Sequence, residues 1–412
     1  MLQDILRQAW EAMVFNRRRT MITILGMAWG IATVVLLLAY GAGFGRAIEA
    51  IFAEWGTTMI GVFPGRTSEQ AGGDKAGVKI QFTLDDVDTV ASSVPGLLHI
   101  SPMVSKDVPV QDGLHTYTWT VNGANENIAD IMHLPTQMGR FFNGAEVQQR
   151  AHVAVLGSEA LTKFFEGQYP IGQSIRLNGI DFTVVGILEA KMAEGESDNN
   201  RQVYIPFTTM DDIKTTHYLD GIWMNYRGDH EVVQKNLRDT LAAAHHFNPD
   251  DHNAIFVADI MEQLSQFRIL SVALQVLLAL VGALTLGIAG IGLMNIMLVS
   301  VQQRTREIGV EKALGAQRKH ILTQFLAEAI VISSTGGIVG IVLAEVISLL
   351  VGRIRFYSYI AENASAADIY LRISFTSVVV AVGILIVTGL ISGMIPAIRA
   401  ANLDPIEALR YE

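Results

Sequence analysis

The chain has 412 residues, a formal net charge of −10 and no cysteine, and half of its residues are hydrophobic. Its length exceeds that of one small domain, and its positive mean hydropathy indicates a membrane protein that carries a soluble part. Because cysteine is absent, that soluble part must be held together by its core rather than by disulfides.

The N-terminal region predicts a surface helix followed by a membrane span. Residues 1–18 are predicted to form an amphipathic helix on the cytoplasmic face, because apolar residues recur at helical spacing from Leu2 to Met13. Residues 19–44 form the first predicted span, and its charge-free stretch from Met21 to Ala42 can cross a hydrocarbon core of about 30 Å. A cleaved signal peptide is disfavoured, because a signal core has only ~7–15 apolar residues and no small-x-small cleavage site follows.

Three further apolar segments complete a set of four predicted spans: 267–302, 320–351 and 373–398. Within the second of the four, Leu270 to Val301 lies in a charge-free run bounded by Arg268 and Arg304. At about 1.5 Å per residue this run exceeds the bilayer thickness, so its helix is predicted to project beyond the membrane as a stalk. The remaining segments are a loop at 303–319, a short loop at 352–372 and a C-terminal segment at 399–412.

Basic residues that flank the spans predict the orientation of the chain. Three basic groups fall on one side of the membrane if the chain crosses it four times: Arg17 to Arg19, the basic residues of 303–319, and Arg399 with Arg410. Both termini are therefore predicted to be cytoplasmic, with the chain in a cytoplasmic (inner) membrane. One segment disagrees, because the outer loop 352–372 carries Arg353, Arg355 and Arg372. The inner groups outweigh it.

Residues 45–266 are then predicted to form an extracytoplasmic α+β domain, large enough for one or two cores. Two β-α-β units frame it, which predicts a ferredoxin-like sheet. The first unit comprises Thr57–Phe63, a helix after Thr83, and His99–Val110, and the second comprises Gly221–Tyr226, Glu231–Ala244 and Ala254–Val257. Acidic residues outnumber basic ones in this domain, so no nucleic-acid partner is expected.

A mostly-β lobe is predicted to be inserted between the two units, at about 114–206. Its short strands are accompanied by two Asn-Gly pairs, which are typical of hairpin turns. These pairs are Asn122-Gly123 and Asn178-Gly179. The predicted fold is therefore an α-helical membrane protein with four transmembrane helices, plus a large extracytoplasmic domain with a ferredoxin-like lobe and an inserted β lobe.

The loop from Gln303 to Lys319 is patterned more strongly than a simple connector requires. It places Val310, Ala313 and Leu314 at helical spacing, whereas Arg304, Glu311 and Lys312 fall on the other side. The pattern predicts a short amphipathic helix tethered to membrane helices at both ends. Such a helix is suited to transmit force to a cytosolic protein.

The chain carries no motif of an enzyme active site. It has no Gly-x-x-x-x-Gly-Lys-Ser/Thr phosphate loop, no Gly-x-Ser-x-Gly elbow and no His-Glu-x-x-His helix. The best cluster of metal-ligating residue types is His245, His246, Asp250, Asp251 and His252. These residues surround an Asn-Pro-Asp-Asp sequence, which favours a solvated loop over a metal site.

Two features of the spans call for interhelical contacts. Glu328 and Glu345 are ionisable residues inside the third span, so they are expected to bond to neighbouring helices or to lie at the interface, with a relay role less favoured. Three small-xxx-small pairs allow close helix packing, either within one chain or between two chains. These pairs are Gly26–Gly30, Gly336–Gly340 and Gly389–Gly393.

The segment from Arg304 to Ala316 closely resembles the cytoplasmic loop of the MacB/FtsX-type permeases of ABC transporters, the mechanotransmission (type VII) group. Arg304–Gly309 reads Arg-Thr-Arg-Glu-Ile-Gly and Ala313–Ala316 reads Ala-Leu-Gly-Ala, as in that family. The resemblance continues at Gln324–Ala329 and, as a second specific match, at Asp404–Glu412. Similarities at Arg19-Thr20, Leu25-Gly26 and Gly30, and generic ones at Gly139–Phe142 and Val184–Gly186 in the outer domain, extend it over essentially the whole chain.

The resemblance implies that the loop after the second span is a coupling helix that docks on a nucleotide-binding subunit. The residues implied in this contact are Arg304, Arg306, Glu307, Ile308, Gly309, Val310, Lys312, Ala313, Leu314 and Gly315. A C-terminal cytoplasmic contact on the same face is implied for Asp404, Pro405 and Leu409. No cofactor is expected in this chain, because ATP and Mg²⁺ would bind to the partner ATPase subunit.

The resemblance also implies a permease subunit of an exporter, working as a homodimer or with a paralogous permease, and with a periplasmic adaptor and an outer-membrane duct. The fused ATPase domain of MacB is missing from this sequence, so a separate subunit is predicted. Glu311 stands where many relatives carry a basic residue, which predicts that this position influences which ATPase the permease binds. Two alternatives use the same loop: FtsX-like transmission of motion to periplasmic cell-wall hydrolases, and lipoprotein extraction.

Overall fold

The computed structural model describes residues 17–68, 76–113, 115–192 and 199–409, and the chain divides into two compact units. The membrane unit comprises the residues up to Arg46, Ile269–Ile354, and those from Ile369 onward. The outer domain comprises Ala47–Arg268 and Arg355–Asp368. Of the predicted N-terminal amphipathic helix, residues 1–18, only Arg17 and Arg18 are described, and they begin the first long helix.

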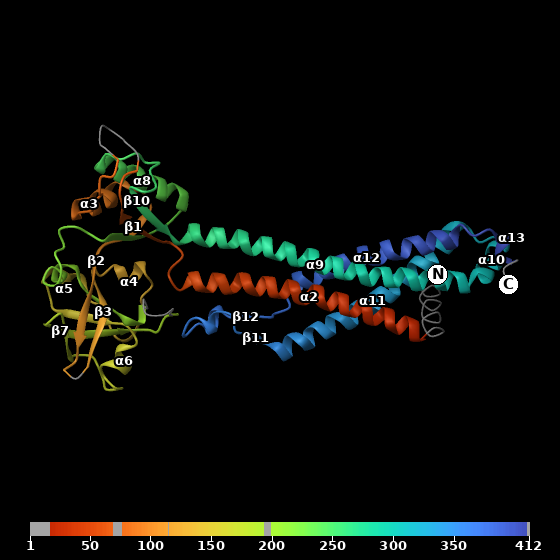
Figure 1. Ribbon diagram of the computed structural model, residues 1–412, viewed down its shortest axis with the longest axis horizontal. Helices are drawn as coiled ribbons and strands as arrows, with labels where there is room; N and C mark the ends of the chain where they lie inside the picture. Colours follow the sequence, from red (N-terminus) through yellow and green to blue (C-terminus); the bar gives the residue numbers. More distant parts are fainter. Residues whose placement is uncertain (1–16, 69–75, 114, 193–198, 410–412) are drawn as a thin grey trace. The chain divides into compact units, whose positions relative to one another are not determined.

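Within the described residues, four helices are long and apolar enough to cross a membrane, as the fold prediction required (Figure 1). They are α2 (Arg17–Ala53), α9 (Ile260–Gln303), α11 (Arg318–Val351) and α12 (Phe375–Ala401). Each begins or ends beyond its predicted span, and α2 and α9 contain residues of both units. With 44 residues, α9 is about 66 Å long, roughly twice the hydrocarbon thickness.

The helices of the membrane unit pack unequally. α11 and α12 pack along each other, and α2 contributes Met27, Ile31 and Val35 to a core shared with Leu286 of α9. In the most apolar 18-residue stretch of α9 only 17% is buried within the chain, whereas 44% of the corresponding stretch of α2 is buried. α9 therefore keeps a large apolar face for lipid or for another protein.

Glycines allow the closest helix contacts of this unit. A Cβ at Gly340 would overlap Ile31 of α2, and one at Gly393 would lie 2.6 Å from the Cβ of Ala329 of α11. Their pair partners Gly336 and Gly389 meet the same two helices, and Gly30 meets Leu286. Five of the six predicted packing glycines thus make contacts within one chain. Gly26 has open space around it.

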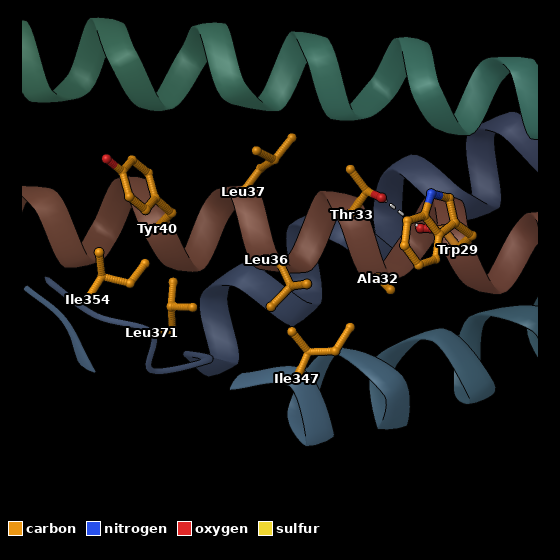
Figure 2. A pocket seen from close by; sticks show the side chains of 9 residues that line it. All are labelled: Trp29, Ala32, Thr33, Leu36, Leu37, Tyr40, Ile347, Ile354 and Leu371. Carbon is orange, nitrogen blue, oxygen red and sulfur yellow. Dashed lines mark hydrogen bonds between the residues drawn. The ribbon is translucent and has the colours of Figure 1, made fainter. Parts of the chain in front are cut away.

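An apolar groove of about 290 Å³ lies between α2, α11 and the two ends of the outer loop 352–372, which belong to the membrane unit (Figure 2). Two short antiparallel strands, β11 (Arg353–Ile354) and β12 (Ile369–Tyr370), hold that loop together. The groove is lined by Trp29, Ala32, Thr33, Leu36, Leu37, Tyr40, Ile347, Ile354 and Leu371.

The outer domain contains the predicted ferredoxin-like arrangement. Its strands β1 (Met59–Pro64), β2 (Leu97–Gln111), β9 (Gly221–Tyr226) and β10 (Ile255–Asp259) are antiparallel, in the spatial order β10-β1-β9-β2. The helices of the two β-α-β units are α3 (Leu84–Ser93) and α8 (His230–His245). α3 begins at the predicted N-cap, where Thr83 and Asp86 form a capping box. Nε2 of His245 lies 2.8 Å from Oδ1 of Asp86 and joins the two helices.

The inserted strands continue this sheet rather than forming a separate one. Beyond β2 the order runs β3-β8-β5-β7-β4, with β6 paired to β2 and β7. Their bounds are β3 Thr116–Ala124, β4 Thr136–Gly139, β5 Val153–Leu156, β6 Ser174–Leu177, β7 Ile180–Leu188 and β8 Gln202–Pro206. The short helices among them are α4 Ile128–Ile131, α5 Gly144–Gln148, α6 Ala160–Lys163 and α7 Phe207–Met210. One hydrophobic cluster spans both lobes, because β2 is long enough to pair on each side.

The two Asn-Gly pairs have different outcomes. Asn178 and Gly179 have φ of 50° and 88° and connect β6 to β7, as predicted for a hairpin turn. The turn predicted at Asn122-Gly123 is wrong, because both residues lie inside β3. There Nδ2 of Asn122 donates to Oε1 of Gln202, and a Cβ on Gly123 would collide with Met210.

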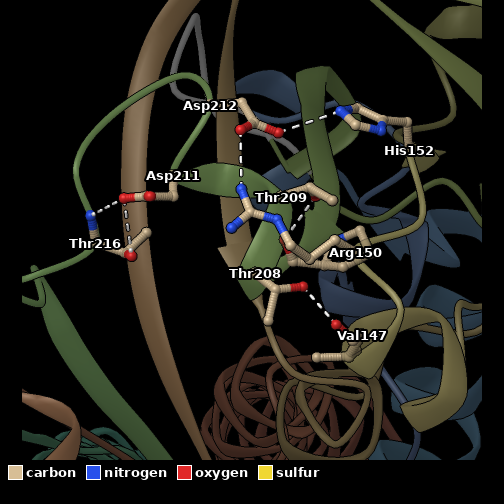
Figure 3. A network of polar contacts seen from close by, with 9 residues as sticks. Val147, Arg150, His152, Thr208, Thr209, Asp211, Asp212 and Thr216 are labelled. Carbon is tan, nitrogen blue, oxygen red and sulfur yellow. Dashed lines mark hydrogen bonds and ion pairs between the residues drawn. The ribbon is translucent and has the colours of Figure 1, made fainter.

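A polar network fixes the segment after β8 to the start of β5 (Figure 3). Oδ1 of Asp212 accepts a hydrogen bond from Nη2 of Arg150 at 2.9 Å, and Oδ2 lies 3.2 Å from Nε2 of His152. The hydroxyl of Thr208 donates to the carbonyl oxygen of Val147. Backbone and carboxylate partners satisfy these side chains, so the network is structural.

Candidate functional site

The patterned loop forms a short helix, α10 (Thr305–Ala313), between α9 and α11. The hydroxyl of Thr305 donates to the carbonyl oxygen of Gln302 at 2.8 Å, which ties the start of α10 to the end of α9. Gly315 follows with φ of 103°, a conformation that favours glycine and ends the helix. The chain then turns directly into α11.

One face of α10 packs into the membrane unit. Thr305, Ile308 and Gly309 are buried, and Ile308 belongs to a core cluster with residues of α9, α11 and α12. That cluster includes Val301, Ile321, Phe325 and Ala400. Ile308 therefore positions the helix, and it presents no surface of its own to a partner.

Glu328 forms an ion pair with the arginine that precedes α10. Nη1 of Arg304 lies 3.4 Å from Oε2 of Glu328, whose side chain is 9% exposed. This pair joins α10 to α11, so Glu328 bonds to a neighbouring element, as was expected. Glu345 is different, because it is exposed and forms no ion pair with any described residue.

Lys312 closes the C-terminal end of α12. Its Nζ donates to the carbonyl oxygen of Ala401 at 2.9 Å and to that of Leu403. The last carbonyls of a helix lack intrahelical partners, and a cation satisfies both their hydrogen bonding and the helix dipole. The loop thus uses two of its basic residues, Arg304 and Lys312, for internal contacts.

The opposite face of α10 is exposed and partly apolar. Leu314 is 85% exposed and Val310 is 44% exposed. The remaining predicted docking residues of this face are also exposed: Arg306, Glu307, Ala313 and Gly315. An exposed leucine flanked by charges of both signs forms a surface that another protein can cover.

The C-terminal segment lies beside this surface. α13 (Pro405–Leu409) packs next to α10 (Figure 1). Oδ1 of Asp404 accepts from the backbone N–H of Ile406 at 2.8 Å and so starts the helix, with Pro405 at its first position. Ile406 is 78% exposed and was missed by sequence reasoning, although an apolar residue just after Asp-Pro is the available signal. The side chain of Leu409 lies outside the described set.

Two residues of the histidine-rich cluster make other contacts in the structure. Among the described residues no group of three or more potential ligands could hold a metal ion. In the histidine-rich loop, His245 bonds to Asp86, and the carboxylate of Asp251 accepts from the backbone and hydroxyl of Ser68. Both residues therefore have structural partners.

Two family models match the chain along most of its length. The MacB-like periplasmic core domain matches residues 20–239, and the FtsX-like permease C-terminal domain matches residues 279–405. The chain belongs to the MacB/FtsX family of ABC transporter permeases. It is a membrane protein with four spans and a periplasmic domain between the first and the second.

Two curated relatives align with nearly the whole chain. It is 34% identical to the macrolide export ATP-binding/permease protein MacB of Bdellovibrio bacteriovorus, over 99% of this chain and 61% of that protein. It is 33% identical to the pyoverdine export ATP-binding/permease protein PvdT of Pseudomonas entomophila, over 99% of this chain and 60% of that protein. The chain thus spans about 60% of the length of these relatives and aligns with their permease part.

A solved structure is also similar to part of the chain. It is the periplasmic region of MacB from Actinobacillus actinomycetemcomitans, with a TM-score of 0.42 and 22% sequence identity, covering 53% of this chain and 94% of that chain. Permeases of the MacB family work with ABC ATPase domains.

Proposed function

We propose that this chain is the transmembrane part of an ABC exporter, driven by an ABC ATPase that docks on α10 and α13. The observation that supports this is the exposed apolar face of α10, with Leu314 at 85% exposure. The opposite face of the same helix is locked into the core and to α12. A force applied to Leu314 would therefore reach α9, α11 and α12 together.

In this proposal, closure of the ATPase dimer moves α10, and α9 carries the movement to the outer domain. α9 suits this role because it is one uninterrupted helix of 44 residues that contributes to both units. Its apolar face is mostly unburied within the chain, which supports a permease dimer with a second copy or a paralogue. The outer domain would then move cargo in the periplasm, with an adaptor and an outer-membrane duct.

The proposal places both termini in the cytoplasm and the chain in the inner membrane. It assigns no cargo, because the two relatives are named for a macrolide and for pyoverdine. Export is preferred over transmission to cell-wall hydrolases, since the outer domain matches the MacB-like periplasmic core.

The test is ATPase stimulation in a reconstituted complex of this chain with its ATPase. Leu314→Asp places a charge in the docking contact without touching the core, so stimulation is expected to fall by about tenfold or more while the chain still folds. The matched control is Leu98→Asp, which makes the same change at a leucine of β2 that is 53% exposed. Full stimulation by the Leu314→Asp variant would refute the docking assignment.

A further inference from the structure

The outer loop of the membrane unit gathers three arginines around one tyrosine, on the side where basic residues are normally depleted. Arg353 pairs with Tyr370 across β11 and β12. Nη2 of Arg46, from α2, donates to the carbonyl oxygen of Tyr370 at 3.3 Å, and the guanidinium of Arg372 lies 5.8 Å from the centre of its ring. All three arginine side chains are exposed.

Two of these arginines form the arginine cluster of the site (Arg46 and Arg372), and no carboxylate of the described residues forms an ion pair with either of them. Glu345, on the neighbouring helix α11, forms none either. Guanidinium groups in such positions bind phosphate through paired, charge-assisted hydrogen bonds.

Sequence neighbours of two of the three arginines line one end of the apolar groove. Ile354 and Leu371, which line the groove, are the sequence neighbours of Arg353 and Arg372. Figure 2 shows both beside Tyr40 at one end of the groove, with Trp29 at the other end. The hydroxyl of Thr33 donates to the carbonyl oxygen of Trp29 within its own helix, so it does not make the groove polar.

The length of the groove matches one leaflet of a bilayer. From Trp29 to Tyr40, α2 rises about 16 Å, and half of the hydrocarbon core is about 15 Å. An acyl chain reaching from the headgroup region to the midplane has this length. A helix of a second copy would instead extend across the whole membrane, past the inner end of the groove.

We propose that the groove and the arginine cluster form a binding site for an anionic phospholipid of the outer leaflet, such as phosphatidylglycerol. The acyl chain lies between α2 and α11, and the phosphate lies against Arg46 and Arg372. The bound lipid neutralises the arginines and fills the space between the outer ends of the two helices. This assignment is independent of the cargo and of the ATPase.

The test uses the full chain in bilayers, with brominated acyl chains that quench tryptophan fluorescence at short range. The reporter is Trp29, which lines the groove. A Trp10→Phe background removes the tryptophan of the predicted surface helix, and the tryptophans of the outer domain give the unquenched part of the signal. A small fraction of brominated phosphatidylglycerol in phosphatidylcholine is compared with the same fraction of brominated phosphatidylcholine. The groove is expected to prefer the anionic lipid by about tenfold or more, since each arginine contributes roughly fivefold.

Two variants distinguish the attraction of the lipid by the arginine charges from the insertion of its acyl chain into the groove. The double variant Arg46→Gln/Arg372→Gln should abolish the extra quenching by the anionic lipid, whereas Arg227→Gln, an exposed arginine of the outer domain, should leave it unchanged. Thr33→Phe fills the groove and should also abolish it, with both arginines intact.

Three results would overturn the proposal. The first is equal quenching by the two lipids in the parent chain, or a preference that survives the loss of both arginines. The second is a preference that survives Thr33→Phe, because the lipid would then be gathered by charge without entering the groove. The third is no quenching by either lipid, which would mean that protein covers the groove.

Discussion

The basic residues on the two sides of the membrane unit lie in different surroundings. Around α10, Arg304 pairs with the buried Glu328, and Lys312 donates to the carbonyl oxygens of Ala401, at the end of α12, and of Leu403. On the outer side, Arg46 of α2 and Arg372 of the outer loop are exposed, and neither forms an ion pair in the described parts of the chain. The charge rule that predicts orientation counts these residues alike, although the first group is structural and the second is open to a ligand.

Removing a charge should therefore have its largest effect at Arg304. Arg304→Gln leaves Glu328 buried without a cation, which is expected to lower the free energy of unfolding by about 3 kcal/mol. Arg372→Gln removes the charge of an exposed residue of the outer loop, and it should change the free energy of unfolding by less than about 0.5 kcal/mol. Denaturant unfolding of the purified chain in detergent measures both.

The double variant Arg304→Gln/Glu328→Gln provides the control, because it removes both charges together. It should recover most of the lost stability. Equal effects of the Arg304 and Arg372 changes would erase the distinction between the two sides.

A smaller effect is expected at Lys312. Lys312→Met removes two charge-assisted hydrogen bonds to the end of α12 and should destabilise the chain by about 1.5–2 kcal/mol. Limited proteolysis should also cut after Ala401 more readily, since α13 loses its attachment. Lys319→Met, at an exposed position of the same loop, is the matched control. No difference between the two lysine variants would contradict the capping role.

Lys191 of the outer domain, like Lys312, donates hydrogen bonds to backbone carbonyl oxygens. Its Nζ donates to the carbonyl oxygens of Glu54 and Met132, and burial lowers the pKa of Lys191 to about 8, opposed by the charge of Glu54. An unfolded lysine keeps its proton up to a pKa of about 10.4. Between these values the unfolded state binds more protons than the folded state, so stability rises with pH.

The stability of the outer domain should accordingly rise by about 1–2 kcal/mol from pH 8 to pH 9.5, at up to ~1.4 kcal/mol per pH unit. Denaturation followed by the fluorescence of Trp119 and Trp223 measures this gain. In Lys191→Met the rise should disappear. A slope that is unchanged in this variant would assign the pH dependence to other groups.

The sequence predicts the elements of this protein better than it predicts their partners. Charge-free runs locate the four long helices, and the Thr83 cap and the Asn178-Gly179 turn locate elements of the outer domain, because these signals are local. Asn122-Gly123 carries the same local signal, yet pairing with β8 and the proximity of Met210 place it inside a strand. Only a contact distant in the sequence distinguishes the two pairs.

Contacts distant in the sequence also decide the arrangement of the loop from Gln303 to Lys319. Helical spacing identifies Val310 and Leu314 as one apolar face of α10, but it does not say whether that face is buried. Ile308, three residues after Thr305, packs into the core, while Leu314 is exposed. The roles of Arg304 and Lys312 depend on residues of α11 and α12, which no pattern within the loop reveals.

The measurement that most directly tests the central claim is cross-linking of α10 to the ATPase. The chain has no cysteine, so Leu314→Cys provides a single reactive site in a complex with the ATPase subunit. Leu349→Cys, at the outer end of α11 and 74% exposed, is the control. The account predicts a cross-link from position 314 to the ATPase and none from position 349. Absence of a cross-link from position 314 in a complex that hydrolyses ATP would contradict it.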